Sequence, residues 1–188
     1  MNEREWVKSI IGNLERSLKE RNKNLKVTDG FRLPYSNEIF MYVGDKPSKF
    51  KQIGYETDIL VYEIIEDDKW KPRIVIETKI NSVTTHDAIT YSQKAQSHKN
   101  IHPYLRYGIL LGNMNGTPLP GRLFRHGQHF DFMQSWKGFE AESEEWEKLM
   151  EILENEIETS KVLEEIIYNS RTKSRDKYTI LHRPLLLK

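Results

Sequence analysis

The most informative part of the sequence is Tyr55–Ile80, YETDILVYEIIEDDKWKPRIVIETKI. Two apolar runs within it, Asp58–Ile65 and Arg73–Ile80, are rich in the β-branched and aromatic residues that favour strands. The acidic residues 66–68 between them predict the turn of a hairpin. Both runs carry apolar side chains on each face, so we expect helices to cover the sheet on both sides.

The position of the turn predicts which residues of the hairpin face each other. If the chain turns between residues 67 and 68, the numbers of facing residues sum to 135. This register places Asp58 opposite Glu77 and Tyr62 opposite Arg73. Directly opposed side chains have Cβ atoms about 5 Å apart, and two carboxylates at that separation repel unless a cation or a shared proton relieves them. A divalent metal ion is the natural relief.

Lys79 completes a set of residues with a definite chemical use. Because strand side chains alternate, Lys79 is expected on the face of Glu77, whereas Thr78 points the other way and has a structural role. The carboxylates of Asp58 and Glu77 suit Mg²⁺, which also binds phosphate oxygens and lowers the pKa of a bound water. Lys79 would act as the base, orient that water or stabilise charge on the transition state. The set fits hydrolysis of a phosphodiester.

Asp58 and the tripeptide Glu77-Thr78-Lys79 resemble the PD-(D/E)XK motif of the restriction-endonuclease-like superfamily. In that motif an acidic residue is followed, across a hairpin, by Asp/Glu-x-Lys, and Thr57 stands where the family name has Pro. The likeness covers roughly residues 3–112. It implies a restriction-endonuclease-like α/β (α+β) fold and a Mg²⁺ site at which Mn²⁺ substitutes. It further implies a type II restriction endonuclease, or a subunit of one, that acts on double-stranded DNA.

The resemblance also implies supporting residues. Many members of the superfamily add an upstream glutamate, and Glu38, which precedes a strand expected next to the pair, is preferred over Glu15 on the first helix. Gln93 and Lys94 lie on the next helix and either support phosphate or water at the site or are ordinary surface residues. A second Asp-x-Lys, Asp67-Asp68-Lys69, falls in the predicted turn without an apolar strand before it, so it is set aside.

A second polar patch is Gly121–His129, GRLFRHGQH. It overlaps the segment Leu123–Phe132, for which we predict a hairpin that turns near Gly127. Arginine binds guanine edges bidentately, so the patch is a candidate DNA contact, and an ordinary exposed turn is the alternative. The residues predicted to make this contact are Arg122, Arg125, His126 and His129.

Hydrophobic periodicity predicts the remaining elements. Apolar residues at spacings of three and four indicate helices, and short apolar runs indicate strands. Together they predict a central mixed β-sheet flanked by helices, with a long C-terminal helix. The helices are expected over residues 3–21, 85–99 and 142–169, the strands over 38–43 and 105–112, and a polar connection over 22–30.

A length of 188 residues fits a single domain, 1–188, with a core over about residues 1–135 and an acidic helix and basic tail over about 140–188. No apolar run approaches the roughly 20 residues of a membrane-spanning helix, and the charged N-terminus lacks the apolar stretch of a secretory signal. Zero cysteines exclude disulfides, Cys-ligated zinc and thiol nucleophiles. We therefore expect a cytoplasmic protein without a membrane partner.

The formal net charge of +1 is an average over two opposite parts. Residues 140–170 hold eleven glutamates against two lysines, a net charge of −9, so the rest of the chain carries +10. A basic body with a segregated acidic helix is compatible with a nucleic-acid partner. A merely solvated acidic face is the alternative.

The sequence thus predicts a metal-dependent endodeoxyribonuclease. The alternatives are a non-cleaving DNA-binding or assembly protein on the same fold, and a nuclease that acts on RNA or branched DNA. One active site cuts one strand, so cutting both strands of a duplex predicts a homodimer or a partner subunit.

Overall fold

A computed structural model describes residues 1–169, 173 and 178–187 of the chain. Its central sheet contains five strands: β1 (Leu25–Asp29), β4 (Ile59–Glu66), β5 (Lys69–Ile80), β6 (Arg106–Gly112) and β7 (Phe132–Ser135). They are ordered β1-β4-β5-β6-β7, with antiparallel pairing from β1 to β5 and parallel pairing from β5 to β7. The predicted mixed sheet is confirmed.

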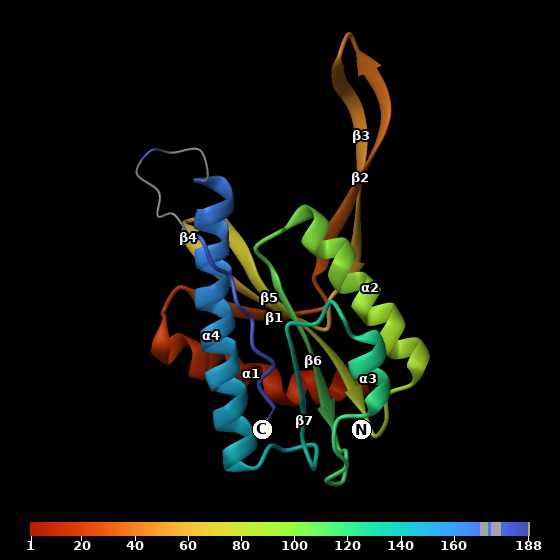
Figure 1. Ribbon diagram of the computed structural model, residues 1–188, viewed down its shortest axis with the longest axis vertical. Helices are drawn as coiled ribbons and strands as arrows, with labels where there is room; N and C mark the ends of the chain where they lie inside the picture. Colours follow the sequence, from red (N-terminus) through yellow and green to blue (C-terminus); the bar gives the residue numbers. More distant parts are fainter. Residues whose placement is uncertain (170–172, 174–177, 188) are drawn as a thin grey trace.

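Helices cover both faces of this sheet (Figure 1): α1 (Glu3–Arg21), α2 (Thr85–Ile101), α3 (Gly121–His126) and α4 (Ser143–Tyr168). On one face Ile59 belongs to the same buried cluster as Leu14 of α1 and Leu153 of α4. On the other face Val75 packs in a cluster with Ala95 of α2. Alternate residues of the strands therefore fill two separate cores, as the apolar pattern predicted.

The β4–β5 hairpin has the predicted register at its open end. Ile59 faces Ile76 and Leu60 faces Val75. Asp58 directly precedes β4, so it reaches the level of Glu77 on β5. The two candidate carboxylates thus lie at the same end of two neighbouring antiparallel strands.

A bulge changes the register nearer the turn. Tyr62 faces Pro72, so its predicted pairing with Arg73 is wrong. Proline has no backbone N–H to give to the ladder, and such residues are accommodated at bulges. Arg73 is buried and binds Glu63 of β4 at 2.8 Å and Glu164 of α4 at 2.6 Å.

Two segments differ from the sequence-based expectation. The polar connection predicted over residues 22–30 contains β1, an edge strand in which only Leu25 is buried, so its apolar signal is weak. The hairpin predicted over residues 123–132 is wrong, because the segment begins within α3 and ends in β7. Since β7 runs parallel to β6, the connection must cross over the sheet, and α3 lies on that crossover.

A separate hairpin, β2 (Arg32–Val43) and β3 (Lys46–Glu56), projects from the body (Figure 1). The sequence predicted only part of β2, because β3 is rich in lysine and its strand signal is weak. The hairpin is tied to the body at its base, where the Phe31 carbonyl accepts hydrogen bonds from the N–H and the hydroxyl of Thr57. We call residues 37–51, the outer part of this hairpin, the arm.

The predicted long C-terminal helix is confirmed as α4, which carries most of the acidic window. Lys71 and Arg73 of β5 both bind Glu164, so ion pairs hold the far part of α4 on the sheet. Among the helices that the structure describes, none combines the length and the apolar character needed to cross a membrane. Four residues of the predicted basic tail lie outside the described residues: Arg171, Arg175, Lys177 and Lys188.

Candidate active site

Thr78 holds the carboxylate of Asp58. The Oδ2 atom of Asp58 accepts one hydrogen bond from the Thr78 backbone N–H at 2.7 Å and another from the Thr78 hydroxyl at 2.9 Å. The sequence predicts a structural role for Thr78 on the face opposite Glu77, and its contact with Asp58 gives that role a definite form. Its buried side chain fixes the orientation of a candidate metal ligand.

Glu77 is fully buried and fully hydrogen-bonded. Its Oε1 accepts from the Tyr107 hydroxyl at 2.5 Å. The Lys94 ammonium lies 2.8 Å from Oε1 and 2.9 Å from Oε2. Burial raises the pKa of Glu77, and the charge of Asp58 raises it further, while Lys94 and Tyr107 act in the opposite direction. The buried carboxylate therefore depends on Lys94 for its compensating charge.

Lys79 shares the face of Glu77 but binds other partners. Its Nζ lies 3.0 Å from Glu3 of α1 and 3.5 Å from Asp87 of α2. Partial burial opposes the charge on Lys79, but the hydrogen bond to Glu3 and the neighbouring Tyr91 outweigh it, so the pKa of Lys79 is raised. A protonated Lys79 is suited to orient a water or to stabilise negative charge.

The ring of Tyr91 lies near the ammonium groups of both Lys79 and Lys94. Lys79 Nζ lies 5.6 Å and Lys94 Nζ 5.3 Å from the centre of its ring, within the range of cation–π attraction. Burial raises the pKa of Tyr91 to about 12, and the carboxylates of Asp58 and Glu77 contribute to this rise. Tyr91 is therefore a neutral phenol within electrostatic reach of both carboxylates and both lysines.

Three of the suggested supporting residues lie elsewhere. Glu38 is exposed on the arm, opposite Lys51 in a sheet separate from that of the pair, so its predicted place at the site is wrong. The physical reason is that β2 does not join the central sheet. Glu15 binds Lys19 on the surface of α1, and Gln93 is exposed on α2. The glutamate that α1 brings to the site is Glu3, through its contact with Lys79.

The arginine-rich patch lies on α3 and the loop after it. Arg122 donates to the Val83 carbonyl at 3.0 Å, and Arg125 is exposed. His126 and His129 are half-buried, and the backbone N–H of His129 donates to the Ser92 hydroxyl of α2. α3 packs beside α2, so the patch shares a face of the sheet with Lys94 and Tyr91.

Four residues of the site were missed by sequence reasoning: Glu3, Asp87, Tyr91 and Tyr107. A signal existed for Tyr91, which stands three residues before Lys94 and hence on the same helical face. Nothing local marks Glu3, because 76 residues separate it from the lysine that it binds. Its place depends on how α1 crosses the sheet.

The carboxylate oxygens of Asp58 and Glu77 suit a divalent metal ion, although the Lys94 ammonium already neutralises the charge of Glu77. The hydrogen bonds described for Asp58 use only Oδ2, whereas both oxygens of Glu77 contact Lys94. Within the described part of the chain, no group of three His, Asp or Glu side chains is arranged to hold a metal. Asp58 and Glu77 fit Mg²⁺ by their hard oxygen atoms, and a metal at Glu77 would compete with the Lys94 ion pair.

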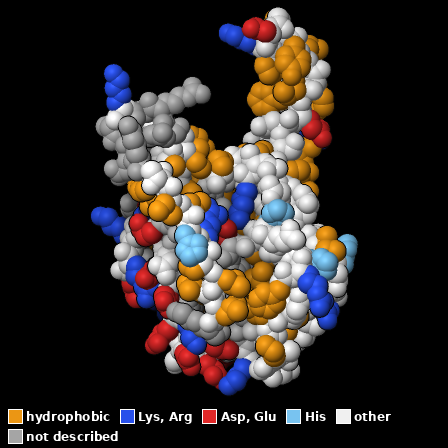
Figure 2. All heavy atoms as spheres, viewed as in Figure 1, with side chains coloured by type: hydrophobic (Ala, Val, Ile, Leu, Met, Phe, Trp, Pro, Cys, Tyr) orange, Lys and Arg blue, Asp and Glu red, His pale blue; other side chains and the backbone are white. Residues whose placement is uncertain are grey.

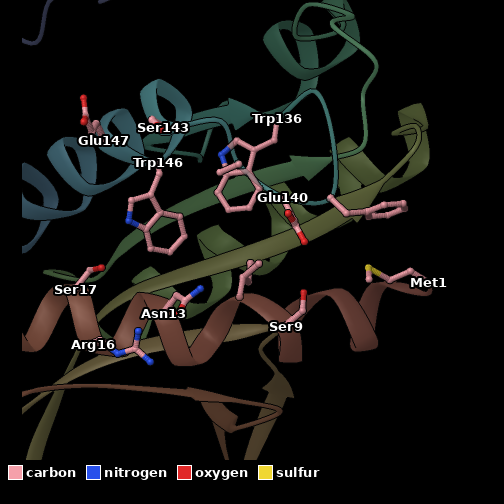
Figure 3. A pocket seen from close by; sticks show the side chains of 13 residues that line it. Met1, Ser9, Asn13, Arg16, Ser17, Trp136, Glu140, Ser143, Trp146 and Glu147 are labelled. Atoms are coloured by element: carbon pink, nitrogen blue, oxygen red, sulfur yellow. The ribbon is translucent and has the colours of Figure 1, made fainter.

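Two cavities lie near α1. A cavity of about 660 Å³ lies between α1 and the start of α4 and is lined by Trp136 and Trp146 (Figure 3). A smaller cavity of about 170 Å³ is lined by Glu3, Asp58 and Thr78. Of these two cavities the smaller one adjoins Asp58, and Glu77 lines neither of them, so the chemistry of the residues locates the site better than cavity size does.

Comparisons with known proteins do not assign the chain to a family. No protein-family model matches the chain, and no curated protein is significantly similar to it.

Proposed function

We propose that this protein is a cytoplasmic, metal-dependent endodeoxyribonuclease of the PD-(D/E)XK class, a type II restriction endonuclease or a subunit of one. The observation that carries the proposal is that Asp58 and Glu77 lie at the same level, at the open end of the β4–β5 hairpin, with Lys79 and Lys94 on the face of Glu77. Two carboxylates and two ammonium groups suit a metal ion and a phosphate. Double-stranded DNA is the proposed substrate.

The residues divide the work of hydrolysis as follows. Asp58 and Glu77 would hold Mg²⁺, which supplies Lewis-acid activation of the phosphate when bound. Thr78 keeps the Asp58 carboxylate in place. Protonated Lys79 would stabilise the negative charge that grows when water adds to phosphorus and a P–O ester bond breaks. One such site cuts one strand, so cleavage of a duplex needs a second copy or a partner subunit.

Plasmid cleavage tests the proposal. Supercoiled DNA incubated with the protein and Mg²⁺ or Mn²⁺ should be nicked and linearised. Asp58→Asn and Lys79→Met should each lower the rate by about 100-fold or more. The second Asp-x-Lys pattern gives matched controls, because Asp67 lies in the turn and Lys69, the first residue of β5, pairs with Glu66 on the surface. Asp67→Asn and Lys69→Met should cut like the wild type, and equal cutting by all four variants would refute the assignment.

One observation favours the non-cleaving alternative. Glu77 is buried and bound through both oxygens by Lys94, so the site is stable without a metal ion. A protein that binds DNA without cutting should retard a duplex in a gel with or without Mg²⁺ and leave plasmids intact. An RNA or branched-DNA nuclease would cut those substrates and spare the plasmid.

A further inference from the structure

The arm exposes an unusual amount of apolar surface. Figure 2 shows hydrophobic side chains gathered on the projecting hairpin. Five of them are consecutive in β2, so they occupy both faces of the hairpin, and the sixth comes from β3. Ile39, Phe40, Met41, Tyr42, Val43 and Phe50 are each 45–69% exposed.

The exposed area approaches that of a complete interface. An aromatic side chain has about 150–250 Å² to bury. At about 200 Å² for each of the six, the two faces of the arm together leave on the order of 700 Å² open to water. A standard protein interface hides roughly 800 Å² on each partner. The two-stranded sheet consists of β2 and β3 alone, so each strand of the arm has a free edge. Free apolar edges aggregate unless something covers them.

We propose that the arm is a dimerisation element and that the arm of a second copy of this chain covers it. An antiparallel edge is self-complementary about a two-fold axis, as a symmetric dimer requires. The arm carries three lysines and two acidic residues, a net charge of +1, so two arms repel only weakly. It contains no arginine, whereas interfaces with DNA are strongly positive. These features favour a second copy over DNA as the occupant.

The base of the hairpin that carries the arm contacts α2 and adjoins the candidate site. The Leu33 carbonyl at this base contacts the buried ring of His98 on α2 at 3.0 Å. The Glu56 carbonyl accepts a hydrogen bond from Lys94, and Asp58 follows two residues later. Joining two arms would thus set the distance between two candidate sites. The inference rests on the exposed arm and not on nuclease activity, so the two proposals can fail separately.

The mass in solution tests the inference. Sedimentation velocity over a dilution series should give a species of twice 22.3 kDa. Phe40→Thr combined with Phe50→Thr should weaken the dimer at least about tenfold, because threonine keeps the strand propensity and removes the aromatic contact. The matched control is Phe124→Thr, since Phe124 is 50% exposed on α3. Unchanged thermal unfolding would show that each variant is folded.

Disulfide trapping gives an independent readout, because the chain has no cysteine. Under mild oxidation Val43→Cys should form a covalent dimer, whereas Val162→Cys, at an exposed valine of α4, should not. A monomeric wild type, or equal trapping at both positions, would overturn the inference. Loss of DNA binding by the Phe40 and Phe50 variant, with the wild type monomeric, would also overturn it and assign the arm to DNA.

Discussion

Glu77 is the residue whose environment matters most at the candidate site. Burial penalises its charge, and Lys94 and Tyr107 compensate. Lys94→Met removes the compensating charge, so we expect the free energy of unfolding at pH 7 to fall by about 3 kcal/mol. Urea unfolding measures this loss.

The pH dependence separates this mechanism from a simple packing defect. The folded-state pKa of Glu77 is above its unfolded value, so the unfolded state holds fewer protons between the two values. Lys94 lowers the pKa of Glu77, so Lys94→Met raises that pKa further. The loss of stability should be complete above the pKa of Glu77 in this variant and should shrink as the pH falls below it. Glu77→Gln combined with Lys94→Met should recover most of the stability, and a loss that is equal at all pH values would contradict the mechanism.

His98 gives a second pH-dependent prediction. Burial lowers its pKa from 6.5 to about 4, although the contact with the Leu33 carbonyl acts in the opposite direction. The unfolded chain therefore binds a proton that the folded protein excludes, and stability should fall as the pH drops from 6.5 towards 4. The full loss is on the order of 3 kcal/mol. His98→Gln should flatten this part of the urea-unfolding profile, whereas exposed His86→Gln should leave its slope unchanged.

The sequence predicted the carboxylate pair and its two lysines but not the residues that these lysines contact. A two-residue turn and a register are local properties, and they sufficed to bring Asp58 to the level of Glu77. The partners of Lys79 come from α1 and α2, whose packing is a tertiary property. Strand alternation predicted that Lys79 lies on the same face of β5 as Glu77, whereas only the folded structure shows which residues Lys79 contacts.

At the scale of elements, burial explains what could be predicted. β5 and β6 bury continuous apolar stretches, and α1 and α4 each bury an apolar stripe, so their sequence patterns are strong. β1, β3 and α3 bury few side chains and lie at an edge, on the projecting hairpin or on a crossover. Their patterns resemble those of loops, and α3 was mistaken for part of a hairpin for this reason.

Ion pairs attach the far part of α4 to the sheet, and this attachment is testable. Arg73 is 3% exposed and joins Glu63 to Glu164. Arg73→Ala leaves the buried Glu63 with longer contacts of 3.4 Å to Lys161 and Asn22, so we expect the free energy of unfolding to fall by about 3 kcal/mol. Amide exchange should quicken around Glu164 and remain slow near Leu149, which is in the core. The more exposed Lys161→Ala should cost less than about 1 kcal/mol, and equal effects of both changes would contradict the role of Arg73.

At the scale of the whole molecule, a net charge of +1 conceals an acidic α4 and a basic remainder. Long-range attraction to DNA depends on the local electric field at the protein surface and not on the net charge. The acidic window belongs to a helix of one face, while Lys94, Arg122 and Arg125 belong to the other. Charge segregation therefore gives the two faces different affinities for a polyanion, and the proposed DNA contacts lie on the face of α2 and α3.

The two proposals together predict how a duplex is cut. If joined arms hold two active sites on one DNA molecule, the second strand is cut before the complex dissociates, because the second event is intramolecular. The Phe40→Thr and Phe50→Thr variant should keep its nicking rate per site and accumulate nicked circles, whereas the wild type should yield linear DNA with few nicked intermediates. Time courses on supercoiled plasmid at low protein concentration measure both rates. Linear product at the wild-type rate from a monomeric variant would show that cleavage of both strands does not need the arms.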